Sequence, residues 1–129
     1  MTALFTEEWF AAVRPELADV AGPPTLSATV QVEVTGGSDG DAICRVEFTD
    51  GRLVDAGPGP ADGADVTLTV SEADARDILA GRLDPSVAFM QGRMKVNGSM
   101  GPVIDLLSLS ATEGARDRRA RVAGLSGLD

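Results

Sequence analysis

Few side chains of this protein could carry out acid–base, nucleophilic or metal chemistry. The sequence contains no histidine and no tyrosine, which excludes Ser–His–Asp and Cys–His arrangements and any histidine-based metal site. Lys95 is the only lysine, and its expected place on the outer face of a strand argues against the burial that would lower its pKa. Cys44 is the only cysteine and is expected to point inward as a small core residue. We therefore expect a protein that is not an enzyme and needs no metal or other cofactor.

Three other patterns only approach a catalytic or metal-binding motif. The run Asn97–Gly101 (NGSMG) lacks the first glycine of a nucleophile elbow. Two pairs of aspartates lie beside glycines, but calcium loops need more oxygen ligands and a bidentate glutamate, so turn formation is the better interpretation. These pairs are Asp39 with Asp41 and Asp62 with Asp65. An enzyme would need a buried carboxylate with a shifted pKa, for which Asp105 is the one obvious candidate.

A cluster of methionines points instead to an apolar site. Met90, Met94 and Met100, three of the four methionines, fall within eleven residues and are separated by glycines. Methionine is flexible and polarizable, so such a cluster suits an adaptable apolar cavity. Methionines at such spacings are more often core packing than cavity lining.

Length, charge and cysteine content narrow the class of protein. A chain of 129 residues suffices for one domain with a real core. The net charge of −9 argues against nucleic-acid binding, which requires a basic footprint. A lone cysteine excludes an internal disulfide, and the sequence shows neither a signal peptide nor an apolar run long enough to span a membrane. We expect a cytoplasmic protein, monomeric or weakly dimeric.

The C-terminal segment differs in charge from the rest. Residues 116–129 hold four arginines and two aspartates, whereas the preceding chain is strongly acidic. We divide the chain into a domain over residues 1–111 and an arginine-rich helix or flexible tail over residues 112–129. This tail could contact an anionic surface or fold back on the acidic body, and a solvated helix or frayed end is the simpler interpretation.

Hydrophobic periodicity predicts a helix followed by four strands. Thr6 is a suitable N-cap for a helix, which Pro15 should end or kink near Arg14. Alternating apolar residues predict strands over 28–34, 42–49, 53–56 and 66–70, with Asp50-Gly51 as a hairpin turn. Short turns between them indicate an antiparallel meander.

The second half of the chain predicts helices around a fifth strand. Ser71 and Asp84 are N-caps of two short helices, and alternation over residues 92–97 predicts the strand. Gly101-Pro102 begins a last helix, apolar nearly all round, over residues 103–109. The fold class is therefore α+β.

The stretch Leu79–Met100 (LAGRLDPSVAFMQGRMKVNGSM) carries a resemblance to a known family. An acidic helix ending in Gly81 is followed by an Asp-Pro turn, a short apolar helix, a Gly-basic-Met-basic run and Gly98. In these features and in its order of elements, over about residues 6–111, the chain resembles the sterol carrier protein 2 (SCP2) sterol-binding domain. The resemblance implies a five-stranded, mostly antiparallel sheet covered on one face by helices. It also implies an apolar tunnel between the sheet and the C-terminal helices.

The resemblance further implies which residues line this tunnel. They would come from the short helix, the fifth strand and the last helix, with two aromatic residues closing one end. The expected lining residues are Trp9, Phe10, Ile78, Leu83, Phe89, Met90, Met94, Met100, Val103, Ile104 and Leu107. The C-terminal segment covers the tunnel mouth in the family, so here it would act as a mobile lid.

The function implied is non-enzymatic binding and carrying of an apolar lipid, such as a sterol, fatty acid or fatty acyl compound. The alternative is an SCP2-like subunit that packs on a partner enzyme without binding lipid. Side chains that fill the space between the sheet and the last helix would favour this alternative. Contact with membranes would at most be transient, because the body of the protein is so acidic.

Overall fold

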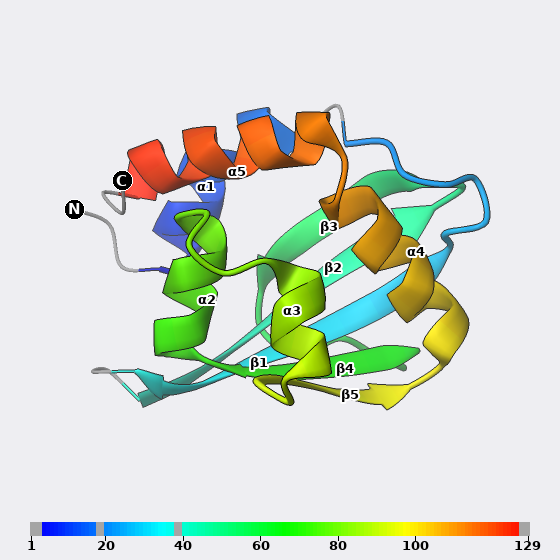
Figure 1. Cartoon of the computed structure of the whole chain (residues 1–129), viewed down its shortest axis with the longest axis horizontal. Helices are drawn as coiled ribbons and strands as arrows, with labels where there is room; N and C mark the ends of the chain where they lie inside the picture. The colour runs from blue at the N-terminus through cyan, green and yellow to red at the C-terminus, as the bar shows by residue number, and fades with distance from the viewer. Residues whose placement is uncertain (1–3, 18–19, 38–39, 127–129) are drawn as a thin grey trace.

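A mixed five-stranded sheet forms the framework of the part of the chain that the structure describes, residues 4–17, 20–37 and 40–126 (Figure 1). The structure is a computed structural model. The strand order is β3-β2-β1-β4-β5. The strands are β1 (Ala28–Gly37), β2 (Gly40–Thr49), β3 (Arg52–Pro58), β4 (Val66–Ser71) and β5 (Met94–Gly98).

The predicted alternation of the strands is confirmed. Val30, Val34, Val66 and Val70 are buried on the face of the sheet that the helices cover. Polar residues such as Gln31 alternate with them on the other face. Because side chains of a strand alternate between faces, this pattern specifies which face carries the core.

The prediction of a simple meander is wrong for the fourth strand. β1, β2 and β3 are antiparallel neighbours, but β4 pairs with β1 in parallel. The segment between β3 and β4 crosses two strands: Gly59 N–H donates to Ile43 O, and Ala61 N–H donates to the Gln31 Oε1. These contacts carry the chain over β2 and β1 to the other side of β1. Seven residues, Gly59 to Asp65, suffice for this crossing, whereas a hairpin would use only two to five.

The turn between β2 and β3 forms as predicted. Asp50 and Gly51 have φ angles of 51° and 84°, as the favoured two-residue hairpin turn requires. A Cβ added to Gly51 would lie 2.5 Å from Gly22 O, so only glycine fits there. The turn predicted between the first two strands includes Ser38 and Asp39, which lie outside the described residues.

All the helices lie on one face of the sheet (Figure 1). α1 and α5 run side by side at one end, and α3 and α4 lie over the region of β4 and β5. The helices are α1 (Glu7–Leu17), α2 (Glu72–Leu79), α3 (Pro85–Met90), α4 (Met100–Ser110) and α5 (Glu113–Ser126). The predicted α+β architecture is therefore confirmed.

α1 begins as predicted and extends beyond Pro15, so of the two predicted effects of this proline the end of the helix is wrong. The Thr6 Oγ1 accepts a hydrogen bond from Trp9 N–H, which makes Thr6 the N-cap. Pro15 does not end the helix, which continues to Leu17. Pro15 is exposed, and Leu17 beyond it packs against two apolar clusters. This packing offsets the one backbone hydrogen bond that a proline forfeits.

The caps of the next two helices are confirmed. Asp74 N–H donates to Ser71 Oγ at 3.1 Å, and Ser86 N–H donates to Asp84 Oδ1 at 2.8 Å.

An ion pair joins the start of β5 to α2. The Arg93 Nη2 lies 2.6 Å from the Asp74 Oδ1. The hydrogen bond and the charge of Arg93 lower the pKa of Asp74.

Candidate functional site

An apolar cavity of about 360 Å³ lies between the sheet and the helices α1, α4 and α5. This volume is in the range of small-molecule binding sites. Its walls are almost entirely aliphatic and aromatic side chains. They include Trp9, Phe10, Val13 and Leu17 from α1; Val32, Cys44, Val46, Phe48 and Leu53 from the sheet; and Leu106, Leu109, Ala115 and Val122 from α4 and α5.

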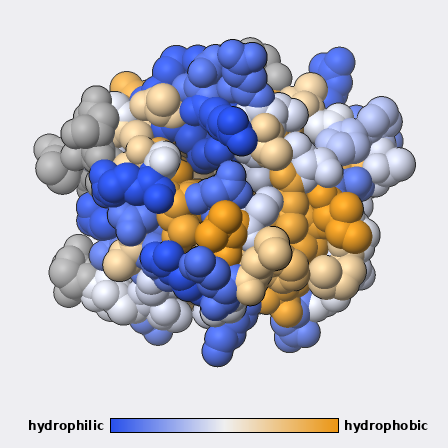
Figure 2. Space-filling model, in the orientation of Figure 1, coloured by the Kyte–Doolittle hydropathy of each residue, from blue (hydrophilic) through white to orange (hydrophobic). Residues whose placement is uncertain are grey.

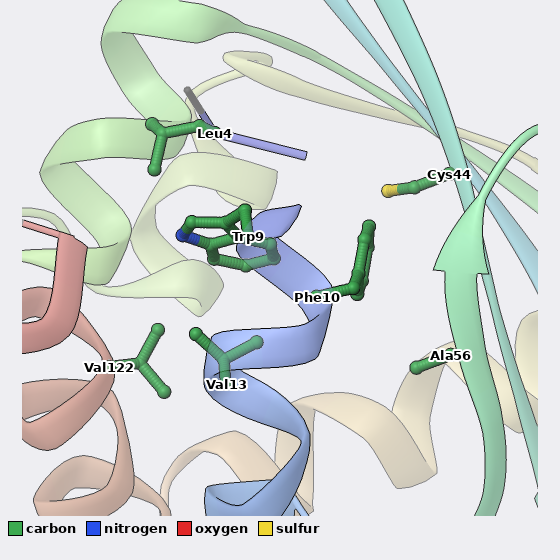
Figure 3. Packing of buried hydrophobic residues seen from close by; sticks show 7 residues of the cluster. All are labelled: Leu4, Trp9, Phe10, Val13, Cys44, Ala56 and Val122. Carbon is green, nitrogen blue, oxygen red and sulfur yellow. The ribbon is translucent and has the colours of Figure 1, made fainter. Parts of the chain in front are cut away.

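Aromatic residues of α1 form one wall of this cavity (Figure 3). The ring of Trp9 packs edge-on against Phe10, with 4.9 Å between the ring centroids. It also contacts the tilted ring of Phe5, at a centroid distance of 5.2 Å. Trp9 and Phe10 are 6% and 3% exposed. Figure 3 shows Val122 of α5 pointing toward Val13 of α1, so these two helices enclose the wall together.

Cys44 belongs to the cavity wall and has no catalytic character. Its sulfur points from β2 toward the ring of Phe10 (Figure 3). Burial among apolar groups raises the pKa of the thiol to about 11. Because the thiolate is the nucleophilic form, the thiol is inert at neutral pH. The prediction that Cys44 is a small core residue is confirmed.

The polar groups of the wall lie together where α4 meets α5. They are Ser110, Arg118 and Arg119. Arg118 Nε donates to the backbone oxygen of Glu16 at 2.7 Å, and Arg119 Nη1 donates to the backbone oxygen of Ser110 at 2.9 Å. The cavity therefore has an apolar body and a polar, cationic margin on one side.

A second, polar cavity of about 340 Å³ adjoins α5 on the side of α2 and α3. Arg116, Arg119 and Asp84 supply its charged groups, and Leu83 is buried in its wall. Arg119 lines both cavities.

Only two of the eleven predicted lining residues, Trp9 and Phe10, line the apolar cavity. Three others lie at the surface: Met90 is 82% exposed, Met100 48% and Ile104 58%. Figure 2 shows the apolar surface that results over α3 and α4. The three methionines thus do not form one wall of this cavity.

The other six predicted residues pack elsewhere. Val103 and Leu107 contact the cluster around Val30 and Val66, and Ile78 and Met94 contact the cluster around Val34 and Val70. Leu83 is buried beside the polar cavity, and Phe89 is half-buried. Contact of these nine residues with a lipid stays a prediction.

The periodicity of the last apolar helix did not specify which face lies over the sheet. α4 turns Leu106 and Leu109 to the cavity, whereas Ile104 faces solvent. Nearly every position of this helix is apolar, so no polar stripe fixed its rotation in advance. The strand alternation did contain a usable signal, because it placed Cys44, Val46 and Phe48 on the inner face.

The contribution of α5 was not predicted as part of the wall. The sequence of this helix is dominated by arginines and lacks an apolar stripe. Small or β-branched residues nevertheless bring it close to α1, and Ala115, Val122 and Ala123 are buried. No three potential metal ligands come together among the described residues, and no described helix is long and apolar enough to cross a membrane.

Comparison with known proteins agrees with this architecture. The model of the SCP-2 sterol transfer family matches residues 12–110. Hydroxysteroid dehydrogenase-like protein 2 of Bos taurus is 34% identical over 104 residues, which are 80% of this chain and 24% of that protein. Sterol carrier protein 2 of Bos taurus is 30% identical over 79 residues, 61% of this chain and 14% of that protein. The chain therefore spans less than a quarter of the length of either relative.

The fold is shared with solved structures. The solution structure of protein TT1886 of Thermus thermophilus superposes with a TM-score of 0.73 at 19% identity, covering 95% of this chain and 91% of that one. The family match covers most of the chain and includes the Asp-Pro turn, the short helix and the glycine-basic run. This chain belongs to the SCP-2 sterol transfer family.

Proposed function

We propose that this domain binds a lipid without chemical conversion and carries it, with the apolar part of the lipid in the cavity between the sheet, α1, α4 and α5. The observation that carries this proposal is the apolar cavity of about 360 Å³ in a member of a sterol-transfer family. Each methylene moved from water into such a space contributes about 0.8 kcal/mol. A buried chain of about ten methylenes therefore supplies about 8 kcal/mol before the entropic cost of association.

The side chains of the cavity wall favour a lipid-carrier function rather than a catalytic one. The one thiol has a raised pKa, and Asp105, the one candidate acid on α4, accepts a hydrogen bond from the Thr25 hydroxyl at 2.9 Å. Asp105 does not line the cavity. Hydroxysteroid dehydrogenase-like protein 2 is more than four times as long as the matched segment, so its name gives no activity to this domain.

The alternative, a subunit that packs on a partner enzyme without lipid, predicts an interior filled by side chains. A cavity of this size argues against it. A partner enzyme that receives the lipid is compatible with our proposal.

A cavity-filling substitution tests the proposal. Val46 lies in the middle of the sheet and faces the cavity, whereas Ile43 of the same strand is 40% exposed on the other face. Val46→Phe is expected to reduce displacement of a fluorescent fatty acid by dodecanoate at least tenfold. Ile43→Phe, which adds a phenyl ring to the same strand, should leave it unchanged. Equal binding by the two variants would contradict the proposed site.

The same assay tests whether the lipid binds at the predicted lining residues that lie outside the apolar cavity, with Ile104 as their representative. Ile104→Ser changes an exposed residue of α4 that lies away from the cavity. Unchanged dodecanoate binding by this variant supports the cavity as the site. Weakened binding would support a site at the surface of α3 and α4, as the methionine cluster suggests.

A further inference from the structure

Arg119 is a half-buried cation between the two cavities. It lies on α5, lines the apolar cavity with its neighbours from α4, and also lines the polar cavity beside α2 and α3. One hydrogen bond, from Nη1 to the backbone oxygen of Ser110, is formed within the described part of the chain. A guanidinium has five N–H donors, so most of its donor capacity is available.

Arg119 differs in its charge partner from Arg121 of the same helix. Arg121 forms an ion pair with the Glu16 carboxylate at 2.6 Å. Among the described residues, no carboxylate forms an ion pair with Arg119. Burial lowers the pKa of Arg119, the nearby Asp84 acts in the opposite direction, and Arg116 adds to the lowering. Asp84 thus compensates the partly desolvated charge of Arg119 only in part, and an anion from outside would offset the remaining cost of burial.

The polar cavity has the charge balance of an anion site. Arg116 and Arg119 stand against the single carboxylate of Asp84. That carboxylate already accepts the N–H of Ser86 as the N-cap of α3. The cavity therefore carries a positive charge in a protein whose net charge is −9.

We propose that Arg119 binds the anionic headgroup of a single-chain lipid at the polar cavity while the chain occupies the apolar cavity, so that this residue makes the domain prefer anionic over uncharged lipids. This inference rests on the proposed function and assigns a specificity-determining residue to its site. The planar guanidinium suits a carboxylate or phosphate, because two N–H groups can bind two oxygens at once. An uncharged sterol or alcohol would leave Arg119 without an ion-pair partner.

Paired ligands that differ only in the headgroup test the inference. Binding of dodecanoate, dodecyl phosphate and dodecanol is measured by displacement of a neutral fluorescent lipid from the whole protein. Arg119→Gln is expected to weaken binding of the anions about tenfold to a hundredfold, as for a lost charged hydrogen bond, and to change dodecanol binding less than twofold. Arg52→Gln is the control, because it removes the same charge from an exposed residue of β3 that lines neither cavity.

Two further variants guard against a folding defect of Arg119→Gln. Arg119→Lys keeps the charge and should retain most of the anion binding. Arg116→Gln removes an exposed charge from the polar cavity and should weaken anion binding about twofold to fivefold, again without affecting dodecanol.

The outcomes separate this inference from the function on which it rests. If none of the three ligands binds the unmodified protein, the proposed function fails and the inference fails with it. If dodecanol and dodecanoate bind and Arg119→Gln weakens both equally or neither, only the assignment of Arg119 is wrong. Acetate, which has the headgroup without a chain, should not compete with dodecanoate at equal concentration. Competition by acetate would mean that the headgroup alone determines binding, and the assignment of the chain to the apolar cavity would be wrong.

Discussion

The Trp9 indole Nε1 donates a hydrogen bond of 2.8 Å to the Ser126 Oγ, and both side chains are buried. Ser126 Oγ in turn donates to the backbone oxygen of Val122 at 2.7 Å. The bond joins the first helix to the last, across the end of the apolar cavity that Trp9 and Val122 line. The position of α5 over the cavity thus depends on a polar contact inside an apolar cluster.

Removing the hydroxyl from this contact should destabilise the fold. Ser126→Ala leaves the indole N–H buried without an acceptor, which costs about 1–3 kcal/mol in the free energy of unfolding. Urea unfolding, followed by the fluorescence of the single tryptophan, measures this loss. Ser108→Ala, at an exposed position of α4, should cost about 0.5 kcal/mol or less. Equal losses in the two variants would show that the hydrogen bond contributes nothing.

The buried thiol should make the stability fall at alkaline pH. The pKa of Cys44 is about 11 in the folded protein and about 8.5–9 in an unfolded chain. Between these values the unfolded state releases the proton and the folded state keeps it, so unfolding becomes easier as the pH rises. The loss amounts to about 2–3 kcal/mol by pH 11, at about 1.4 kcal/mol for each pKa unit.

Unfolding curves at several pH values between 8 and 11 check this expectation. Cys44→Ala should unfold with a smaller pH dependence over this interval, since other groups titrate equally in both proteins. An identical pH dependence in the two proteins would mean that the thiol is not buried as the structure describes.

Gly98, at the end of β5, should tolerate no side chain. Its φ is 121°, and a Cβ there would lie 2.3 Å from the backbone oxygen of Asp65. Gly98→Ala should therefore lower the free energy of unfolding by about 3 kcal/mol or more, through backbone strain and displacement of β4. Gly101→Ala is the matched control, because a Cβ at Gly101 in α4 meets nothing within 4 Å. A thermal melt in which both variants behave alike would contradict the close approach.

The ion pair between Glu16 of α1 and Arg121 of α5 should slow ligand exchange if α5 acts as a lid. Glu16→Gln removes the carboxylate that pairs with Arg121 at 2.6 Å. An exposed pair of this kind is worth about 0.2–1 kcal/mol, so dissociation of dodecanoate should accelerate up to about fivefold. Glu7→Gln makes the same change at a glutamate paired with Arg14 of its own helix and should not alter the rate. Stopped-flow displacement measures both, and equal rates in the two variants would argue against the lid.

The sheet and its inner face were predictable because strand side chains alternate with a period of two. Val30, Cys44 and Val66 are buried as the pattern requires. The parallel position of β4 was not predictable from alternation, which is the same for parallel and antiparallel pairs. The length of the Gly/Pro loop between Pro58 and Val66 was the available signal.

The cavity wall was less predictable than the fold. Periodicity identifies apolar residues, but it does not separate those that pack against one another from those that border an empty space. The family resemblance implied Ile104 and not Leu106 as a lining residue of α4. Both positions are apolar, so the sequence could not decide between them, because the rotation of the helix depends on tertiary packing. The role of Arg119 could not be predicted, because it depends on the position of α5 between two cavities.

The parallel pairing of β1 with β4 has a consequence for how the chain is made. On the ribosome, β1, β2 and β3 emerge before β4, and one edge of β1 has no partner until residues 66–71 have been synthesised. The cover supplied by α4 and α5 arrives later still. A nascent chain that stalls between β3 and β4 therefore presents an open strand edge beside an apolar face that only α1 can cover, the combination that promotes aggregation. We expect chaperones to bind the nascent protein at this stage and to release it once β4 has docked against β1.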